Sequence, residues 1–245
     1  MTKGYLSEIF LSYQGEGLHA GRRHLFVRLS GCHLRCRYCD TPGSLERTAT
    51  LRVYDRHGLR CEVPNPLRPA EVLAHALPLL DAEADADGVA ITGGEPLLQA
   101  DFLAELLADA RWPRPRLLET SGTLPEKLAG VLPVVDVVSM DIKLPSNTGE
   151  APCWDSHGEF LAAAGQKAYV KVLVDEGTAI DDVQRAAELV AREAPTIPFF
   201  LQPITGPSGG VDLSAAALDR FFRVARARLN DVRVFPQLHK LLGIQ

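Results

Sequence analysis

The sequence lacks any apolar run near the ~20 residues that a membrane-spanning helix requires. It also lacks a basic block, since the formal net charge is −5 and both signs are mixed along the chain. Its first residues, MTKGYLSEIF, contain no apolar segment of the signal-peptide type. We therefore expect a cytoplasmic protein that binds neither a membrane nor a nucleic acid.

Cysteine is scarce, and its odd count of five in 245 residues argues against a framework of disulfide bonds. Cys61 and Cys153 stand alone and are interpreted as ordinary reduced thiols. The other three share the spacing C-x3-C-x2-C, at Cys32, Cys36 and Cys39. Three thiolates can hold three irons of a 4Fe–4S cluster and leave the fourth iron open to a small molecule. The alternative is a zinc site with His33 as the fourth ligand, which its place beside Cys32 would strain.

Strand-like and helix-like segments alternate along the chain. Short apolar runs predict buried strands at His24–Ser30, Gly88–Thr92, Arg116–Thr120, Val134–Met140, Ala168–Val174, Pro198–Gln202 and Val232–Pro236. Helical apolar spacing, with a capping Asp at the start of the second segment, predicts helices at Pro69–Ala82, Asp101–Arg111, Ile180–Glu193 and Leu213–Leu229. This order predicts one α/β domain over residues 1–245, with a parallel sheet that is either open or a partial barrel.

One segment, Thr41–Pro69, departs from this alternation. Its run TLRVYDRHGLRCEV predicts a β-hairpin that turns near His57 and Gly58, and a proline-rich loop follows. We interpret the segment as an inserted excursion over the mouth of the barrel and not as a second domain.

Polar residues gather where the predicted strands end. The cysteine loop follows Ser30, the run TGGEP (Thr92–Pro96) follows the next strand, and SMDIK (Ser139–Lys143) ends another. Because the active site of an α/β barrel lies at the carboxyl ends of its strands, these runs predict one common site. The paired glycines let a backbone approach a ligand closely. The simpler alternatives are a plain turn for TGGEP and a solvated strand end for SMDIK.

These motifs resemble two nested families. The cysteine spacing followed by GGEP resembles the radical S-adenosylmethionine (SAM) superfamily. The runs EIFLSYQGEGLHAG, FVRLSGC, CDT, ITGGEPLLQ and QLHKLLGIQ resemble the 7-carboxy-7-deazaguanine synthase family, with Thr41–Pro69 the part least covered. The resemblance implies a partial (β/α) barrel of the radical SAM type.

The resemblance also implies the site residues. The cluster would be held by Cys32, Cys36 and Cys39, and a Mg²⁺ ion by Thr41. SAM would be bound by Tyr38, Cys39, Asp40, Gly93, Gly94, Glu95, Ser139, Asp141, Lys143, Lys171 and Gln202. The substrate, 6-carboxy-5,6,7,8-tetrahydropterin, would be bound by Tyr13, Gln14, Gly15, Glu16, Arg28, Thr92, His239 and Gln245. The candidates for a general base are Glu16 and His239.

Each substrate position has a simpler interpretation when it is taken alone. The run Gln14–Gly17 suits a turn, Arg28 suits an ion-paired strand residue, Thr41 suits a cap, and His239 suits a structural histidine. Their joint occurrence at the spacing of the family favours a binding site.

The implied reaction is a radical ring contraction within queuosine and deazapurine biosynthesis. A 5′-deoxyadenosyl radical would take hydrogen from C6 of the pterin, and loss of ammonia would yield 7-carboxy-7-deazaguanine. Flavodoxin or ferredoxin would supply the electron, and the chain would act as a homodimer. Two alternatives remain at this point. A glycyl-radical activating enzyme would share the cluster, GGEP and the Asp141–Lys143 run, and a zinc-holding interaction module would need only the cysteines.

Overall fold

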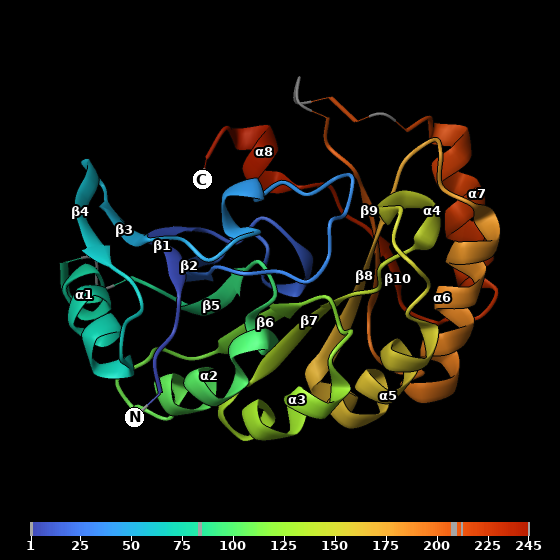
Figure 1. Cartoon of the computed structure of the whole chain (residues 1–245). Coiled ribbons are helices and arrows are strands. Elements are labelled where there is room, and N and C mark those ends of the chain that lie inside the picture. The colour runs from blue at the N-terminus through green and yellow to red at the C-terminus, as the bar shows by residue number, and fades with distance from the viewer. Residues whose placement is uncertain (1, 83–84, 207–209, 212, 245) are drawn as a thin grey trace.

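The computed structural model describes residues 2–82, 85–206, 210–211 and 213–244. Ten strands form one curved sheet in the order β10-β9-β8-β7-β6-β5-β2-β1-β3-β4. Figure 1 shows α2, α3, α5 and α6 in a row along one side of this sheet, with α8 on the opposite side. The two outermost strands, β10 and β4, do not pair with each other within the described ranges, so the barrel is partial, as predicted.

The seven predicted strands are confirmed and form the parallel part of the sheet. They are β2 (Arg23–Leu29), β5 (Gly88–Gly93), β6 (Arg116–Thr120), β7 (Val137–Asp141), β8 (Ala168–Val174), β9 (Phe199–Pro203) and β10 (Val232–Val234). The bounds differ most at β7, which begins at Val137 and not at Val134, because Leu132–Val134 form a 3-10 turn. All seven strands run in the same direction, so their carboxyl ends meet at one edge of the sheet.

A strand that the sequence analysis did not predict, β1 (Leu6–Tyr13), precedes them and pairs antiparallel with β2. Polar residues such as Ser7 and Ser12 interrupt its apolar pattern, yet both are buried because the strand lies inside the sheet. Because β1 runs antiparallel to β2, its carboxyl end pairs Tyr13 with Arg23 at the amino end of β2. The loop that follows turns back into the barrel, where the Gln14 side chain reaches Glu119 near the carboxyl end of β6.

The predicted hairpin is confirmed as β3 (Thr50–Asp55) and β4 (Gly58–Pro64), but its predicted location is wrong. It does not cover the barrel mouth, because β3 pairs in parallel with β1 through Glu8↔Arg52 and Ile9↔Val53. Burial of Leu51 and Val53 in the main core fixes the hairpin there, as an extension of the sheet.

The helices follow the predictions with one correction. The predicted spans of α1 (Pro69–Ala82) and α6 (Ile180–Glu193) are confirmed, and α7 (Ala215–Arg226) lies within its predicted range, capped by Ser214. α2 (Ala100–Leu107) starts after Gln99, so Asp101 lies inside the helix and is not its cap. The helix also ends four residues before the predicted Arg111. Just beyond its end, the Trp112 indole donates a hydrogen bond to the Leu106 carbonyl (2.7 Å). The unpredicted helices are α3 (Pro125–Val131), α4 (Pro145–Thr148), α5 (Trp154–Ala164) and α8 (Leu238–Leu242). None of the described helices is both long and apolar enough to cross a membrane.

A small aromatic cluster fills part of the barrel interior. It contains Phe10, Phe26, Tyr169 and Phe200, and the rings of Phe10 and Phe26 stack with centroids 5.1 Å apart. Phe26 also borders a cavity that the strand ends surround. The cluster therefore fills space that a bound molecule would otherwise occupy, and it leaves the polar edge of the barrel for the site.

The close contact of β5 with β2 at Gly93 yields a stability prediction. Gly93 has φ +117°, and a Cβ there would lie 2.0 Å from the Leu29 carbonyl oxygen, which belongs to the neighbouring backbone. We expect Gly93→Ala to lower the free energy of unfolding by at least about 2 kcal/mol, measured by urea denaturation without cofactors. The control is Gly130→Ala, where a Cβ meets nothing within 4 Å. That change should be neutral or raise stability by up to about 1 kcal/mol. Equal effects of the two changes would contradict the prediction.

Candidate active site

A cavity of about 320 Å³ lies at the carboxyl ends of the strands. Its walls come from the loop after β1, the cysteine loop after β2, the ends of β5 to β9 and the segment after β10. Residues far apart in the sequence therefore share one enclosure, at the edge where the strand-end motifs predicted a site.

The cavity walls contain nearly every site residue predicted from the sequence. The predicted cluster and magnesium residues that line it are Cys32, Cys36, Cys39 and Thr41. The predicted SAM residues that line it also include Tyr38, Asp40, Gly93, Gly94, Ser139, Asp141, Lys143, Lys171 and Gln202. The predicted substrate residues that line it are Tyr13, Gln14, Gly15, Glu16, Arg28, Thr92 and His239. Glu95 lies behind the wall, and Gln245 lies outside the described residues.

The cysteine loop is held against its surroundings by hydrogen bonds to backbone carbonyls, one from a backbone N–H and two from the Arg37 guanidinium. Cys32 N–H donates to the Leu45 carbonyl (2.9 Å), and Arg37 donates to the carbonyls of Ser146 (2.6 Å) and Asn147 (3.0 Å) in α4. All three thiols face the same cavity, which suits a cluster with one open iron. The zinc alternative loses its fourth ligand, because the His33 ring instead meets the Thr123 hydroxyl at 2.9 Å.

The protein environment alone does not favour thiolates at these positions. Burial raises the pKa of Cys32, and it raises the pKa of Cys36 to about 11. Iron would therefore have to displace the protons on binding, as metals do at thiolate sites.

The GGEP run positions a neighbouring loop. Gly94 N–H donates to the Leu29 carbonyl (3.0 Å), which fixes the glycine backbone along the cavity wall. The Glu95 carboxylate is 1% exposed and accepts hydrogen bonds from Leu97 N–H, the Thr120 hydroxyl, Ser121 N–H and the Ser121 hydroxyl, at 2.6–3.0 Å. Glu95 therefore fastens the loop after β6 behind the wall, and the neighbouring glycines form the surface that a ligand would meet.

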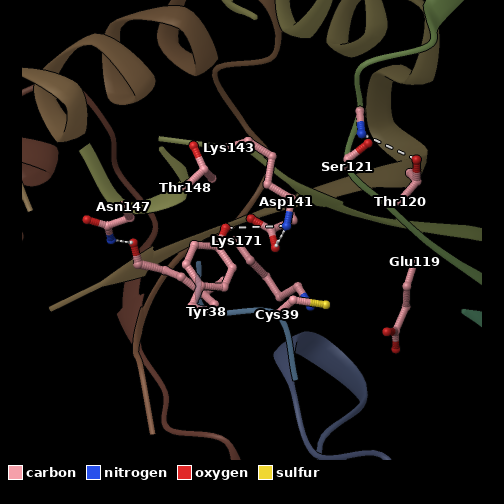
Figure 2. Close-up of polar contacts among 12 residues, drawn as sticks. Tyr38, Cys39, Glu119, Thr120, Ser121, Asp141, Lys143, Asn147, Thr148 and Lys171 are labelled. Atoms are coloured by element: carbon pink, nitrogen blue, oxygen red, sulfur yellow. Dashed lines mark hydrogen bonds and ion pairs between the residues drawn. The ribbon is translucent and has the colours of Figure 1, made fainter. Parts of the chain in front are cut away.

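A polar cluster at the carboxyl end of β7 and just beyond it forms another part of the cavity wall. Lys143 Nζ lies 2.7 Å from Asp141 Oδ2 and 3.4 Å from the Tyr38 hydroxyl, as Figure 2 shows. Burial alone would lower the pKa of Lys143, but the Asp141 carboxylate holds it well above its usual value. The cation is therefore permanent at physiological pH.

Several shielded polar atoms in this wall have no partner within the described part of the chain. They are Asp141 Oδ1 and both amide atoms of Gln202. A buried polar atom normally has a hydrogen-bond partner, so these positions indicate a polar ligand. The amino, carboxylate and ribose groups of SAM supply such partners, and the residues therefore fit that cofactor.

A second polar wall is formed by β1, β2, β5 and β6. Gln14 Nε2 donates to Glu119 Oε1 (2.8 Å), and the Thr92 hydroxyl donates to Glu119 Oε2 (2.9 Å). Between them, Arg28 is aligned with Thr92 across the strands and lies over the Phe10 ring at 5.1 Å. Its Nε is 3.4 Å from Glu8 Oε2, so Arg28 is indeed an ion-paired strand residue as well as part of the cavity wall.

An ion pair between Glu16 and Lys171 joins the loop after β1 to β8. Burial alone would raise the pKa of Glu16, but the Lys171 ammonium lowers it to about 2. Burial likewise opposes the charge on Lys171, and Glu16 raises its pKa above the usual value. Both groups are therefore charged at neutral pH.

The segment after β10 closes the cavity over this loop. Leu238 N–H donates to the Gly15 carbonyl (2.9 Å), and a Cβ on Gly15 would lie 2.0 Å from His239 Nδ1. Gln237 Nε2 donates to Glu16 Oε1 (3.0 Å) and to Asp40 Oδ2 (3.2 Å). Figure 1 shows this segment and α8 on the far side of the sheet from the row of helices.

The sequence analysis missed the roles of Glu119 and Gln237. Glu119 follows an apolar strand in the run ETSG, so its place at a strand end was a usable signal. Gln237 begins the motif QLHK, but nothing in the sequence indicates that its amide would connect Glu16 with Asp40.

Comparisons with known proteins agree with this geometry. The family model described as the Radical SAM superfamily matches residues 26–198. A 7-carboxy-7-deazaguanine synthase of Geobacter sulfurreducens is 36% identical, covering 97% of this chain and 96% of that protein. A protein of the same name from Methanopyrus kandleri is 37% identical, covering 96% and 92%.

Solved structures show the same fold at lower identity. The crystal structure of QueE from Escherichia coli matches with a TM-score of 0.61 at 22% identity, covering 97% of this chain and 95% of that chain. A radical SAM methyltransferase from Sphaerobacter thermophilus matches with a TM-score of 0.58 at 15% identity, covering 94% and 77%. With cluster thiols, a SAM-compatible wall and full-length relatives in agreement, the chain belongs to the 7-carboxy-7-deazaguanine synthase family of the radical SAM superfamily.

Proposed function

We propose that this enzyme converts 6-carboxy-5,6,7,8-tetrahydropterin to 7-carboxy-7-deazaguanine with loss of ammonia. The observation that carries the proposal is the sharing of one cavity by three thiols, a SAM-compatible wall and a second polar wall. The names of the similar full-length relatives support the same reaction. A cavity covered by the segment after β10 suits a small molecule better than the protein segment that a glycyl-radical activating enzyme would admit.

The cofactor side of the cavity would be organised by residues on β5 and β7. Cys32, Cys36 and Cys39 would hold a 4Fe–4S cluster, which together with SAM would supply radical chemistry for the removal of a hydrogen from the substrate. The Gly93–Gly94 backbone, together with Asp141 and Gln202, would fix the polar groups of SAM. Lys143, 2.7 Å from Asp141 Oδ2, would hold the Asp141 carboxylate in place.

The substrate side would be organised by charge and hydrogen bonding. The planar guanidinium of Arg28 suits the substrate carboxylate. Thr41 would offer a hard oxygen to Mg²⁺, beside Glu16, Asp40 and His239, whose ligand atoms lie within 4.8 Å of one another. The residues proposed to contact the pterin are Tyr13, Gln14, Gly15, Glu16, Thr92, His239 and Gln245.

Of the two candidates for a general base, His239 is favoured, because the low pKa of Glu16 makes that carboxylate a poor base. A carboxylate with a pKa near 2 binds a proton too weakly to serve as an efficient base at neutral pH. Glu16 would instead act as a fixed anion that accepts hydrogen bonds, with Lys171 as its counterion.

The proposed biological setting follows the family. Flavodoxin or ferredoxin would deliver the electron, the chain would act as a homodimer, and the reaction would occur in the cytoplasm. The product would enter queuosine or another deazapurine pathway.

The proposed reaction is tested by an anaerobic assay. The protein is reconstituted with iron and sulfide and then given SAM, dithionite, Mg²⁺ and the pterin. Mass spectrometry should detect 7-carboxy-7-deazaguanine, and Cys36→Ala should abolish it, because one of the three cluster ligands is lost. The matched control Cys153→Ala changes a thiol outside the cavity walls and should retain product formation. Cleavage of SAM without any deazaguanine would reject the proposed substrate.

The ion pair between Glu16 and Lys171 predicts a stability effect that depends on pH. Lys171→Met leaves the Glu16 carboxylate buried without its cation and should cost about 3–5 kcal/mol in urea unfolding at pH 7. The double change Glu16→Gln with Lys171→Met should recover part of this loss, because no uncompensated charge remains.

The pH dependence has a definite sign. In the wild type, the pKa of Glu16 is depressed from 4.5 to about 2, so its contribution is present above about pH 4.5 and is lost as pH falls through 2. Without Lys171 burial raises that pKa, and protonation then relieves the cost. The stability gap between the wild type and Lys171→Met should therefore shrink from pH 7 to pH 5, and a constant gap would contradict this explanation.

A further inference from the structure

Glu119 holds two residues of the substrate wall by their hydrogen-bond donors. One carboxylate oxygen accepts from the Gln14 amide and the other from the Thr92 hydroxyl, at 2.8 and 2.9 Å. Gln14 lies in the loop after the antiparallel β1, whereas Thr92 and Glu119 lie near the carboxyl ends of β5 and β6, and all three line the cavity. Glu119 therefore fixes the orientation of groups that a ligand in the cavity would meet.

The carboxylate of Glu119 determines which hydrogen-bonding atoms of Gln14 and Thr92 stay available to a ligand. An ionised carboxylate only accepts hydrogen bonds, so Gln14 must direct its NH₂ group toward Glu119 and Thr92 must direct its single hydrogen there. The Gln14 carbonyl oxygen and the lone pairs of the Thr92 oxygen are then left to accept. Unused lone pairs of Glu119 add to this set, so the part of the wall around Glu119 offers acceptors, while the neighbouring Arg28 offers donors.

Glu119 differs in this respect from the other carboxylate on the same loop network. Glu95 is 1% exposed, lies behind the wall, and has four donors from the chain itself. Glu119 accepts from two donors, Gln14 and Thr92, and borders the cavity. Glu95 therefore stabilises the loop after β6, whereas Glu119 is placed where it can affect a bound molecule.

We propose that Glu119 is a positioning residue that sets the hydrogen-bond polarity of the substrate wall and so selects a ligand edge that donates. This inference rests on the proposed function. The 2-amino-4-oxopyrimidine edge of a pterin carries an NH₂ group and a ring N–H next to each other, and both donate. The 2-oxo counterpart, a lumazine, replaces the NH₂ donor with a carbonyl acceptor, which would face the acceptors of Gln14 and Thr92.

The test compares 6-carboxytetrahydropterin with the corresponding 6-carboxytetrahydrolumazine on the reconstituted enzyme. The wild type should favour the pterin by at least about 10³-fold in kcat/KM, because a wall built for an N–H rejects a ligand that lacks it. Glu119→Gln keeps the shape but lets the amides and the hydroxyl reorient, and we expect the preference to fall by at least about 30-fold. For each variant, the ratio of the dissociation constants of the lumazine and the pterin is measured as well, in the presence of SAM. Glu126→Gln, the same change at an exposed position of α3, should leave the preference at the wild-type value.

The possible outcomes separate this inference from the proposed function. A wild type that neither binds nor converts the pterin overturns both. A wild type that converts the pterin, with Glu119→Gln losing activity equally on both compounds, overturns only the role of Glu119, because a merely structural defect does not change the ratio. If Glu119→Gln fails to fold, Thr92→Val decides. It removes one acceptor and should lower the preference by about 10-fold, and an unchanged preference overturns the inference.

Discussion

The buried ion pair between Glu16 and Lys171 is the contact on which the arrangement of the cavity depends. It attaches the loop after β1 to β8, on the other side of the barrel. Glu16 then receives Gln237, and Gly15 receives the backbone of Leu238, so the last described segment is attached through the same loop. A buried salt bridge is costly to desolvate and adds little net stability, so its main effect here is to position the two charged side chains. It brings an anion and a cation to fixed positions beside the predicted substrate and SAM residues.

Ion pairs recur around the cavity. Asp141 at the end of β7 pairs with Lys143, and Glu8 pairs with Arg28 on the neighbouring strand. Asp141, Lys143 and Arg28 all line the cavity, so each pair holds at least one charged group in place at the wall. The wall formed by Gln14, Thr92 and Glu119 extends the pattern to neutral donors, since a carboxylate dictates how an amide and a hydroxyl are directed.

The sequence predicted the parallel strands, the hairpin and most of the cavity residues, because these features have local signals. Apolar β-branched runs mark buried strands, and motifs at strand ends converge once the strands are parallel. β1 was not predicted, because Ser7 and Ser12 interrupt its apolar pattern and their burial depends on neighbours far along the chain. The hairpin was misplaced for the same kind of reason: its position follows from the pairing of β3 with β1. Likewise, Glu119 and Gln237 are ordinary polar residues until the fold brings them to Gln14 and Glu16.

The closure of the cavity by residues 237–244 has a consequence for how the site can be opened. Leu238 donates to the Gly15 carbonyl, and the Lys240 ammonium lies 3.3 Å from Asp40 Oδ2. These contacts come from one short segment after β10, whereas most of the other walls come from strands that are paired within the sheet. Displacing that segment would therefore uncover the loop after β1 without breaking a strand pair.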